Sequence, residues 1–287
     1  MRTNQCTNHP NIVPFSMTLK AMNVWKFTKS SNNLKLFPSF ILLIYLVRRE
    51  LVTRFRRHYL GFIWILISPI LTSLIMILAF YGIFGVKLNS LFNYSIFVLS
   101  GVIFIQCVNS TIIGVSASLQ NSRSIIGKVS VPIFAIPLAT LFAQVMIFVI
   151  GLVYILFAAN FSEFYDLDLI SLFVSIICLF LILLSIGIIL SVLGSIIPDI
   201  ATALPIFLQG LTYLTPIFYT EDIWSEQVRN LLVFNPLLYF IRAFRNGLGY
   251  SEYGEVNLPL LFMMSSLMLI SSTLIFIIYW PKLIKRI

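Results

Sequence analysis

The sequence predicts an all-α integral membrane protein with six transmembrane helices, an N-terminal cytoplasmic amphipathic helix, and a re-entrant helical hairpin before the last span. Three observations support this. Of the 287 residues, 59% are hydrophobic and only 10% are charged, whereas about a quarter of the residues of a soluble domain are charged. The apolar residues gather in long charge-free runs. A basic cluster stands immediately before the first run.

The charge-free runs mark the spans. We expect them at about 60–84, 94–117, 131–158, 169–195, 200–219 and 257–280. Each run is near or above the roughly 20 residues with which a helix crosses the hydrocarbon core. In lipid the backbone must be bonded within its own segment, so helices are expected. The second span has many polar residues for a segment that crosses lipid, and we expect its polar side chains to face other helices or a polar pathway. These residues are Gln106, Asn109, Ser110 and Thr111.

The basic residues predict the orientation. Most of the 19 Lys and Arg residues precede the first span, lie between the second and third, or follow the sixth. Basic residues collect on the cytoplasmic side of membrane proteins, so we expect both termini in the cytoplasm. The same rule explains the formal net charge of +9, and we expect no nucleic acid as a partner.

The chain divides into a polar cytoplasmic tail at 1–37, an amphipathic interfacial helix at 38–58 and a transmembrane domain at 59–287. Within this domain, residues 221–250 carry apolar residues at spacings of three and four, as a helix does. The pair Asn235-Pro236 should divide them into two short helices. Neither half can span, so we expect both to dip into the outer leaflet. A surface hairpin that only packs is the alternative.

No motif supplies an energy source or a catalytic group. The string SIIGKVS at 124–130 is nearest to a phosphate-binding loop, but Ser122 and Val129 stand where that loop needs Gly and Ser or Thr. The expected spans hold essentially no ionisable residue, which disfavours an ion-coupled carrier. A membrane glycosyltransferase usually places acidic or basic catalytic groups on cytoplasmic loops. The only clear acids in the expected cytoplasmic loops are Glu50 and Asp199, and they are far apart in sequence, so this class is disfavoured. Cysteines and histidines lack ligand spacing, so we expect neither a metal site nor catalytic residues.

Three stretches resemble one known family. RFRRHYLGFIWILISPIL at 54–71 has a basic run followed by Leu60, Gly61, Trp64 and Pro69 in the family's order. LQNSRSIIGKVSVPIFAIPLA at 119–139 is similar to the loop after the family's second span, and NPLLYFIRAFRNGLG at 235–249 to the segment before its last span. The family is that of type-2 ABC exporter permeases, in particular the membrane subunits that export O-antigen polysaccharide, teichoic acid and related glycans.

The resemblance implies a homodimer of this chain with two copies of a separate ABC ATPase. ATP and Mg would bind to that partner, and we expect no cofactor on this chain. A coupling loop at 119–131 would contact the ATPase, although an ordinary positive-inside loop is the alternative. The coupling candidates are Ser122, Arg123, Ser124, Gly127 and Lys128. The helices at 221–250 would shape the exit of a pore. The exit candidates are Asn235, Pro236, Arg242 and Arg245.

The substrate implied by the resemblance is O-antigen polysaccharide linked to undecaprenyl pyrophosphate, moved from cytoplasm to periplasm across a bacterial inner membrane. Export of capsule, teichoic acid or a small molecule stays open as an alternative. Aromatic side chains suit the lining, because their faces stack on sugar rings. The candidates for a channel or gate are Tyr59, Trp64, Tyr81, Tyr213 and Tyr219.

The basic cluster before the first span has two interpretations. In the helix at 38–58, Val47, Leu51 and Phe55 recur at four-residue spacing, which predicts an apolar stripe on the membrane surface. Each basic residue near anionic lipid contributes about 1 kcal/mol, so anchoring is one role. Arginine forks also suit phosphate oxygens, so the cluster is a candidate site for the carrier's pyrophosphate. The candidates are Arg54, Arg56, Arg57 and His58.

Overall fold

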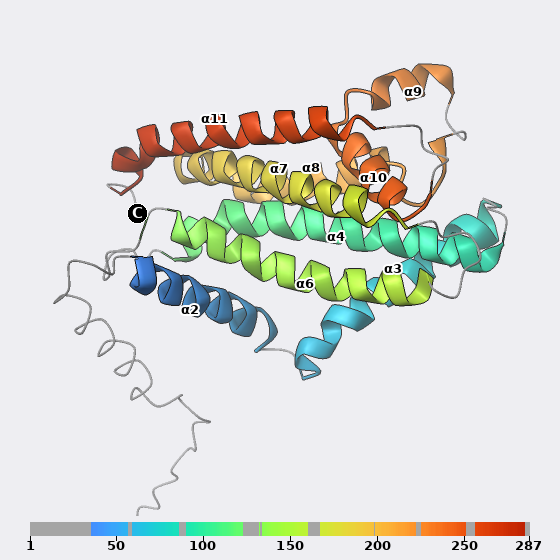
Figure 1. Cartoon of the computed structure of the whole chain (residues 1–287), viewed down its shortest axis with the longest axis horizontal. Helices are drawn as coiled ribbons and strands as arrows, with labels where there is room; N and C mark the ends of the chain where they lie inside the picture. The colour runs from blue at the N-terminus through green and yellow to red at the C-terminus, as the bar shows by residue number, and fades with distance from the viewer. Residues whose placement is uncertain are drawn as a thin grey trace, which may run out of the picture.

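The computed structural model describes residues 36–56, 59–85, 90–122, 132, 134–159, 167–197, 199–221, 225–250 and 256–284. Within these ranges the protein is helical and has no strand (Figure 1). The elements in chain order are α2 (Leu36–Phe55), the 3₁₀ turn η2 (Gly61–Ile63), α3 (Trp64–Ile77), the π-helical turn η3 (Leu78–Ile83), α4 (Leu91–Asn121), α6 (Ala135–Ala159), α7 (Leu169–Ile196), α8 (Ile200–Leu214), α9 (Glu226–Leu232), α10 (Pro236–Gly247) and α11 (Leu258–Ile284).

Five stretches of the described chain are long and apolar enough to cross a membrane. They are Gly61–Ile83, Leu91–Asn121, Ala135–Ala158, Leu169–Ile196 and Leu258–Trp280. They coincide with five of the six spans expected from the sequence. The all-helical, multi-pass membrane architecture is therefore confirmed.

The expected span at 200–219 is helical over its first 15 residues and irregular over its last five. Helix α8 ends at Leu214 after 15 residues, which is about 22 Å and falls short of the roughly 30 Å hydrocarbon core. The cause lies in the next two residues. Pro216 has no N–H to donate, and a residue before proline disfavours the helical conformation. Thr215 is accordingly extended, with φ −96° and ψ 133°.

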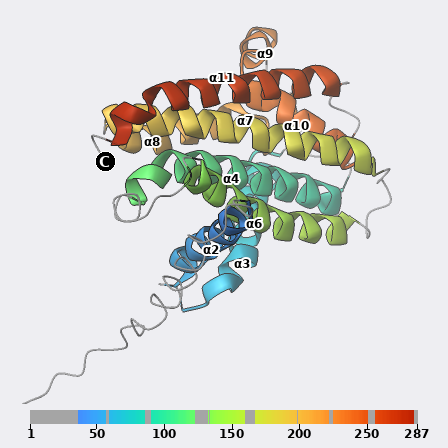
Figure 2. The same ribbon diagram turned by 60° about the vertical axis from the view of Figure 1, so that its left-hand side comes forward.

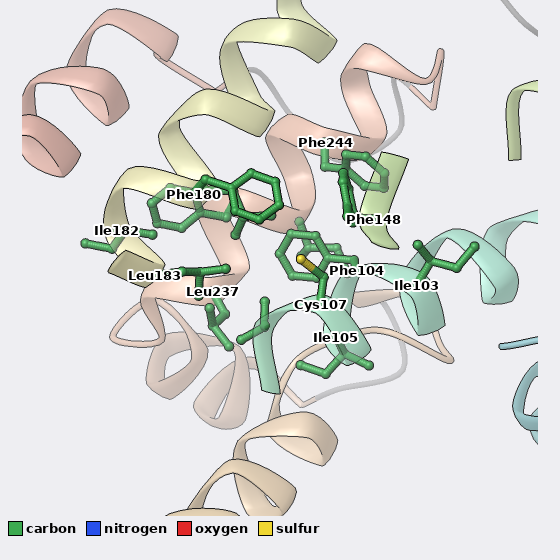
Figure 3. Close-up of a cluster of buried hydrophobic side chains, with 14 of the residues drawn as sticks. Ile103, Phe104, Ile105, Cys107, Phe148, Phe180, Ile182, Leu183, Leu237 and Phe244 are labelled. Carbon is green, nitrogen blue, oxygen red and sulfur yellow. The ribbon is translucent and has the colours of Figure 1, made fainter. Parts of the chain in front are cut away.

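Helix α4 is the centre of the bundle. It packs against α3, α6, α7 and α8, while α7 also packs against α10 and α11. Aromatic rings join the layers (Figure 3): the centroid of Phe244 of α10 lies 5.8 Å from those of Phe104 of α4 and Phe148 of α6, and Phe148 lies 5.6 Å from Phe180 of α7. Because four helices contribute rings to one cluster, their mutual positions are fixed in this part of the core.

Helix α2 lies beside α6 in both views (Figures 1 and 2). Its buried residue Leu46 packs against Ala135, Ile136 and Ala139 of α6. The helix therefore begins two residues and ends three residues before the expected bounds of 38–58. Val47 of the expected stripe packs beside Leu46 and Phe55 is buried, whereas the contact of the stripe with the membrane surface stays a prediction. The opposite face of α2 is also apolar and exposed. Its large apolar side chains are Phe40, Ile41, Ile44, Tyr45 and Val52.

One end of the bundle gathers the segments that the sequence assigned to a single side of the membrane. Figure 1 shows the start of α2, the end of α4, the start of α6 and the end of α11 at its left. Residues 119–121 of the expected coupling loop form the last turn of α4, and residues 123–131 lie outside the described chain. The expected tail at 1–37 also lies outside it, apart from the first two residues of α2.

Candidate functional site

A buried arginine holds the chain where α8 ends. Arg245 of α10 is 1% exposed, and its guanidinium donates from Nη1 to the carbonyl of Pro216 at 2.7 Å and from Nη2 to that of Ile217 at 2.8 Å. The same group lies 3.7 Å above the ring of Phe97 on α4. We call Arg245, Tyr94 and Asn235, together with the irregular segment 215–219 that they hold, the Arg245 clamp.

Further hydrogen bonds of the Arg245 clamp hold this segment. The hydroxyl of Tyr94 donates to the carbonyl of Phe218 at 2.7 Å, and the N–H of Ile217 donates to the carbonyl of Thr215 at 2.7 Å. Asn235 donates from Nδ2 to Thr215 Oγ1 at 2.9 Å. All five residues of the segment are buried. Irregular backbone can exist at membrane depth only where protein groups satisfy it in this way.

Gly101 makes room for the Arg245 clamp. A Cβ atom at this position of α4 would lie 2.7 Å from Ile217 Cγ2, 2.8 Å from the Ile217 carbonyl oxygen and 2.9 Å from Arg245 Nη2. Any larger residue would push the irregular segment away from α4. The glycine is therefore required by close approach.

The structure confirms the helix break at Asn235-Pro236 but places α10 inside the protein. Asn235 caps α10 by accepting from the N–H of Leu237 at 3.0 Å. The apolar residues of α10 are buried, and α10 packs mainly against α7. That both short helices dip into the outer leaflet stays a prediction, and the structure shows that most of the surface of α10 is covered by the protein itself. The shorter α9 lies beyond α11 in both views.

Arg242 lies on the partly exposed side of α10. Its Nε donates to Glu221 Oε1 at 2.7 Å, and its Nη2 pairs with Oε2 of the same carboxylate. These hydrogen bonds raise the pKa of Arg242. The pair joins α10 to the chain that follows the segment 215–219, and so it supports the Arg245 clamp from the side.

A second site is a cavity of about 230 Å³ between α3, α4 and α8. Its wall is apolar apart from six polar side chains. We call this cavity the polar groove and define it by these six residues: Thr72, Gln106, Asn109, Gln209, Thr212 and Tyr213. Among the described residues that line it, none is charged. Gln106 stands halfway along α4, so the polar groove lies at the middle of the longest helix.

Hydrogen bonds in the polar groove join the three helices but leave the side-chain oxygen of Asn109 without a donor. Gln106 Nε2 donates to Thr72 Oγ1 at 3.4 Å, and Asn109 Nδ2 donates to Thr212 Oγ1 at 3.2 Å. Thr212 passes its own proton to the carbonyl of Leu208 at 2.8 Å. Asn109 Oδ1 is buried and has no hydrogen-bond partner in the described part of the chain. An unpaired buried acceptor is rare and costly in a folded protein.

The five aromatic candidates are not brought together. Tyr213 lines the polar groove. Tyr219 is buried and donates its hydroxyl to the carbonyl of Tyr213 at 2.6 Å, so it packs within the turn. Tyr81 lies with its ring 5.7 Å from that of Tyr94, beside the Arg245 clamp. Tyr59 and Trp64 are exposed near the start of α3.

The basic and coupling candidates are only partly described. Arg54 and Arg56 are exposed at the end of α2, whereas Arg57 and His58 lie outside the described residues. Ser122 is buried, and its Oγ accepts from Arg49 Nη1 at 3.4 Å. Arg123, Ser124, Gly127 and Lys128 lie outside the described residues. Within the described ranges no group of three or more His, Cys, Asp and Glu residues could hold a metal ion.

Sequence reasoning missed three members of the polar groove. Thr72, Gln209 and Thr212 are single polar residues in apolar helices, whereas Gln106, Asn109 and Tyr213 were predicted from the sequence to face a polar pathway or a channel. The available signal was Gln209 in α8, since an amide in an otherwise apolar helix at membrane depth needs a partner or a polar cavity. That α3, α4 and α8 converge on one cavity could be learned only from the fold.

Comparisons with known proteins agree with the architecture. Residues 41–249 match the family model of the ABC-2 type transporter. Two O-antigen export system permease proteins of Klebsiella pneumoniae are 23% and 24% identical to this chain, over 72% and 75% of it and 80% and 84% of their own lengths. One from Myxococcus xanthus is 28% identical over 39% of this chain and 42% of its own length. Because the family model matches more than half of the chain, this protein belongs to the ABC-2 type transporter family.

Proposed function

We propose that the protein is the membrane subunit of an ABC exporter that moves O-antigen polysaccharide, linked to undecaprenyl pyrophosphate, from the cytoplasm to the periplasm of a bacterium. The observation that carries the proposal is the family match over 41–249. It is supported by the two O-antigen export system permease proteins of Klebsiella pneumoniae, which align with this chain over most of their own length. The polar groove has an uncharged polar lining, which suits the passage of a sugar chain.

The proposed topology has six crossings with both termini in the cytoplasm of an inner membrane. Five crossings are the long apolar helices, and the sixth is α8 continued by the segment 215–219. The Arg245 clamp supports this sixth crossing, because it pairs the carbonyls that would otherwise meet hydrocarbon. The sequence segments between α4 and α6 and after α11 carry Lys and Arg residues, and the adjoining helix ends lie at one end of the bundle, which supports the cytoplasmic assignment of that end.

We propose that two copies of the chain form the pore between them. Apolar side chains are exposed on α3, such as Leu74 and Ile75, and on α8, such as Ile206 and Phe207. Such faces fit a partner or lipid. The polar groove opens between these two helices, so a second copy that faces α3 and α8 would place both grooves along one path. The helices at 221–250 would then border the exit.

The energy would come from two copies of a separate ABC ATPase that holds ATP and Mg. The segment 119–131 would contact it, and the bond between Arg49 and Ser122 supports a link from the start of this segment to α2. Arg54, Arg56, Arg57 and His58 would meet the pyrophosphate, and Tyr59 and Trp64 would border the lateral gate. The exposure of Arg54 and Arg56 supports access to a lipid headgroup.

The test of this function is deletion of the gene in its native host. We expect loss of O-polysaccharide from the cell surface and accumulation of the lipid-linked chain inside, with both restored by this protein. The neighbouring ATPase should co-purify with it and hydrolyse ATP. Surface O-polysaccharide that persists unchanged after deletion would contradict the proposal.

A double substitution tests the pyrophosphate site separately. Arg56→Gln with Arg57→Gln should reduce export while leaving membrane insertion and ATPase assembly intact, because the forks that fit phosphate oxygens are lost. The matched control is Arg48→Gln in the same helix, which removes a positive charge without touching the candidate residues. If the double variant exports normally, the cluster serves only as an anchor.

A further inference from the structure

We propose that Arg245 sets the topology of an earlier part of the chain: residues 200–219 hold their place across the membrane only after α10 has packed and its arginine has reached them. This inference rests on the proposed topology, in which α8 and the segment 215–219 form the fifth crossing in chain order. Neither the family match nor the relatives assign such a role to Arg245.

The first argument is that α8 has a weak hold on the membrane by itself. Its 15 residues rise about 22 Å, so the segment 215–219 must cover the rest of the roughly 30 Å hydrocarbon core. Leu204 and Leu208 are the residues that α8 buries against the bundle. It also carries Gln209 and Thr212, and polar side chains are costly in hydrocarbon. Helix formation and apolar packing therefore do not fully account for this crossing.

The second argument is that the irregular end of the crossing takes its donors from two other helices. The carbonyl of Phe218 accepts from Tyr94 of α4, whereas those of Pro216 and Ile217 accept from Arg245 of α10. Helix α4 precedes α8 in the chain, but Arg245 follows Pro216 by 29 residues. A carbonyl without a donor is costly in hydrocarbon. Two carbonyls of this crossing thus stay unpaired at membrane depth until α10 is in place.

The third argument is that Arg245 depends on the same contact. Its side chain is 1% exposed, and a charged group at membrane depth is costly unless the protein replaces its water. The two carbonyls do this from one side, and the ring of Phe97 lies 3.7 Å from the guanidinium carbon on another. The end of the fifth crossing and α10 therefore stabilise each other, and each is a poor membrane segment alone.

A glycine fixes the position from which Arg245 reaches the segment. Helix α10 packs mainly against α7. A Cβ atom at Gly247 would lie 2.6 Å from the Cα of Leu172 and 2.7 Å from its backbone nitrogen. Because these are backbone atoms of α7, they cannot give way as a flexible side chain would. A larger residue at 247 should therefore keep α10 from docking while leaving the arginine itself unchanged.

The test is the accessibility of a cysteine beyond the crossing. Ser225 follows the fifth crossing and Leu169 begins α7, and both are exposed; the proposed topology places both outside the inner membrane. The full chain, with its native cysteines replaced by alanine, carries Ser225→Cys or Leu169→Cys and is produced with its ATPase. Intact cells are treated with a maleimide that cannot cross the inner membrane. The measured quantity is the labelled fraction of the full-length protein.

We expect labelling at both positions while Arg245 is present. Arg245→Leu should lower labelling at position 225 about threefold or more, because two carbonyls lose their donor at membrane depth, and should leave position 169 unchanged. Permeabilised cells should recover the label at 225. Arg242→Leu is the matched control and should label normally at both positions. Full labelling at 225 in Arg245→Leu would overturn the proposal, because an arginine that only stabilises the folded protein does not change which side the cysteine faces.

A second variant blocks the docking of α10 without touching the arginine. Gly247→Val should reduce labelling at position 225 as Arg245→Leu does, whereas Gly210→Ala, which adds a methyl group in open space on α8, should label normally. Both experiments use cells that lack the membrane quality-control protease, so that misfolded chains persist. Full labelling in Gly247→Val would count against the proposal. No labelling at 225 in the protein with Arg245 and Gly247 intact would refute the fifth crossing and this inference together, while gene deletion tests the export function separately.

Discussion

The Arg245 clamp and the polar groove share helices α4 and α8 but differ in how their polar atoms are paired. In the clamp, the carbonyls of four successive residues from Thr215 each receive a donor. In the groove, Asn109 Oδ1 is buried and receives none from the described chain. Paired buried carbonyls help to specify one fold, whereas an unpaired buried oxygen lowers the stability of the packing around it.

The contrast also separates two meanings of a polar residue at membrane depth. Ionisable and polar residues there are costly, so each requires an explanation. Arg245 lets the chain leave the helical form after Leu214, and its role is structural. Asn109 and Gln106 each join α4 to a neighbouring helix, α8 and α3 respectively, by one side-chain hydrogen bond, and both line the cavity. The four predictions below test this division, from the largest expected effect to the smallest.

Arg245→Leu should give the largest loss of stability, roughly 3 kcal/mol or more in free energy of unfolding, because buried carbonyls lose a charged donor. The measurement is the thermal unfolding temperature of the detergent-purified protein. Arg242→Leu is the matched control and should cost less, since its ion pair with Glu221 is partly exposed. Equal unfolding temperatures for the two variants would contradict the stabilising role of Arg245 in the clamp.

Gly101→Ala should destabilise the protein by about 1–3 kcal/mol through overpacking, because the new Cβ would lie within 3.0 Å of Ile217 and Arg245. Gly210→Ala in α8 is the control. Nothing lies within 4 Å of its Cβ position, and alanine favours a helix over glycine by up to about 1 kcal/mol. The two changes should therefore shift the unfolding temperature in opposite directions. A shift in the same direction for both would argue against close approach at Gly101.

Tyr94→Phe should cost about 1 kcal/mol, the typical net contribution of one hydrogen bond. It removes only the hydroxyl that donates to Phe218 at 2.7 Å. Tyr45→Phe, which alters an exposed tyrosine of α2, should leave the urea midpoint of unfolding unchanged. No difference between these two variants would show that the Phe218 carbonyl finds another donor.

Asn109→Leu should change stability least, within about 1 kcal/mol and toward a gain. It loses the bond to Thr212 but also removes an unpaired buried oxygen, and the two effects oppose each other. Asn235→Leu serves as the clamp counterpart and should lose about 1–2 kcal/mol, because the α10 cap and the bond to Thr215 both disappear. Should Asn109→Leu prove as damaging as Asn235→Leu, the groove would be a structural network like the clamp.

Much of the fold could be predicted from composition and charge. Long apolar runs must form helices in lipid, and this located the five long helices to within a few residues. The Asn235-Pro236 break was also readable, because proline restricts the residue before it. The same rule applied to Thr215-Pro216 predicts the end of α8 at Leu214, so this helix end is also encoded locally in the sequence.

The site was less accessible. The sequence by itself determined that polar residues cluster in the second span and that arginines follow Asn235-Pro236. Only the tertiary structure decided that Arg245 turns inward onto the carbonyls after α8 and that Asn109 meets Thr212 beside a cavity. The physical reason is range. Helix formation depends on neighbours three or four residues away, whereas the partner of a buried polar atom lies on another element, as for Tyr94 and Phe218, which are 124 residues apart. That partner is fixed only when the helices pack.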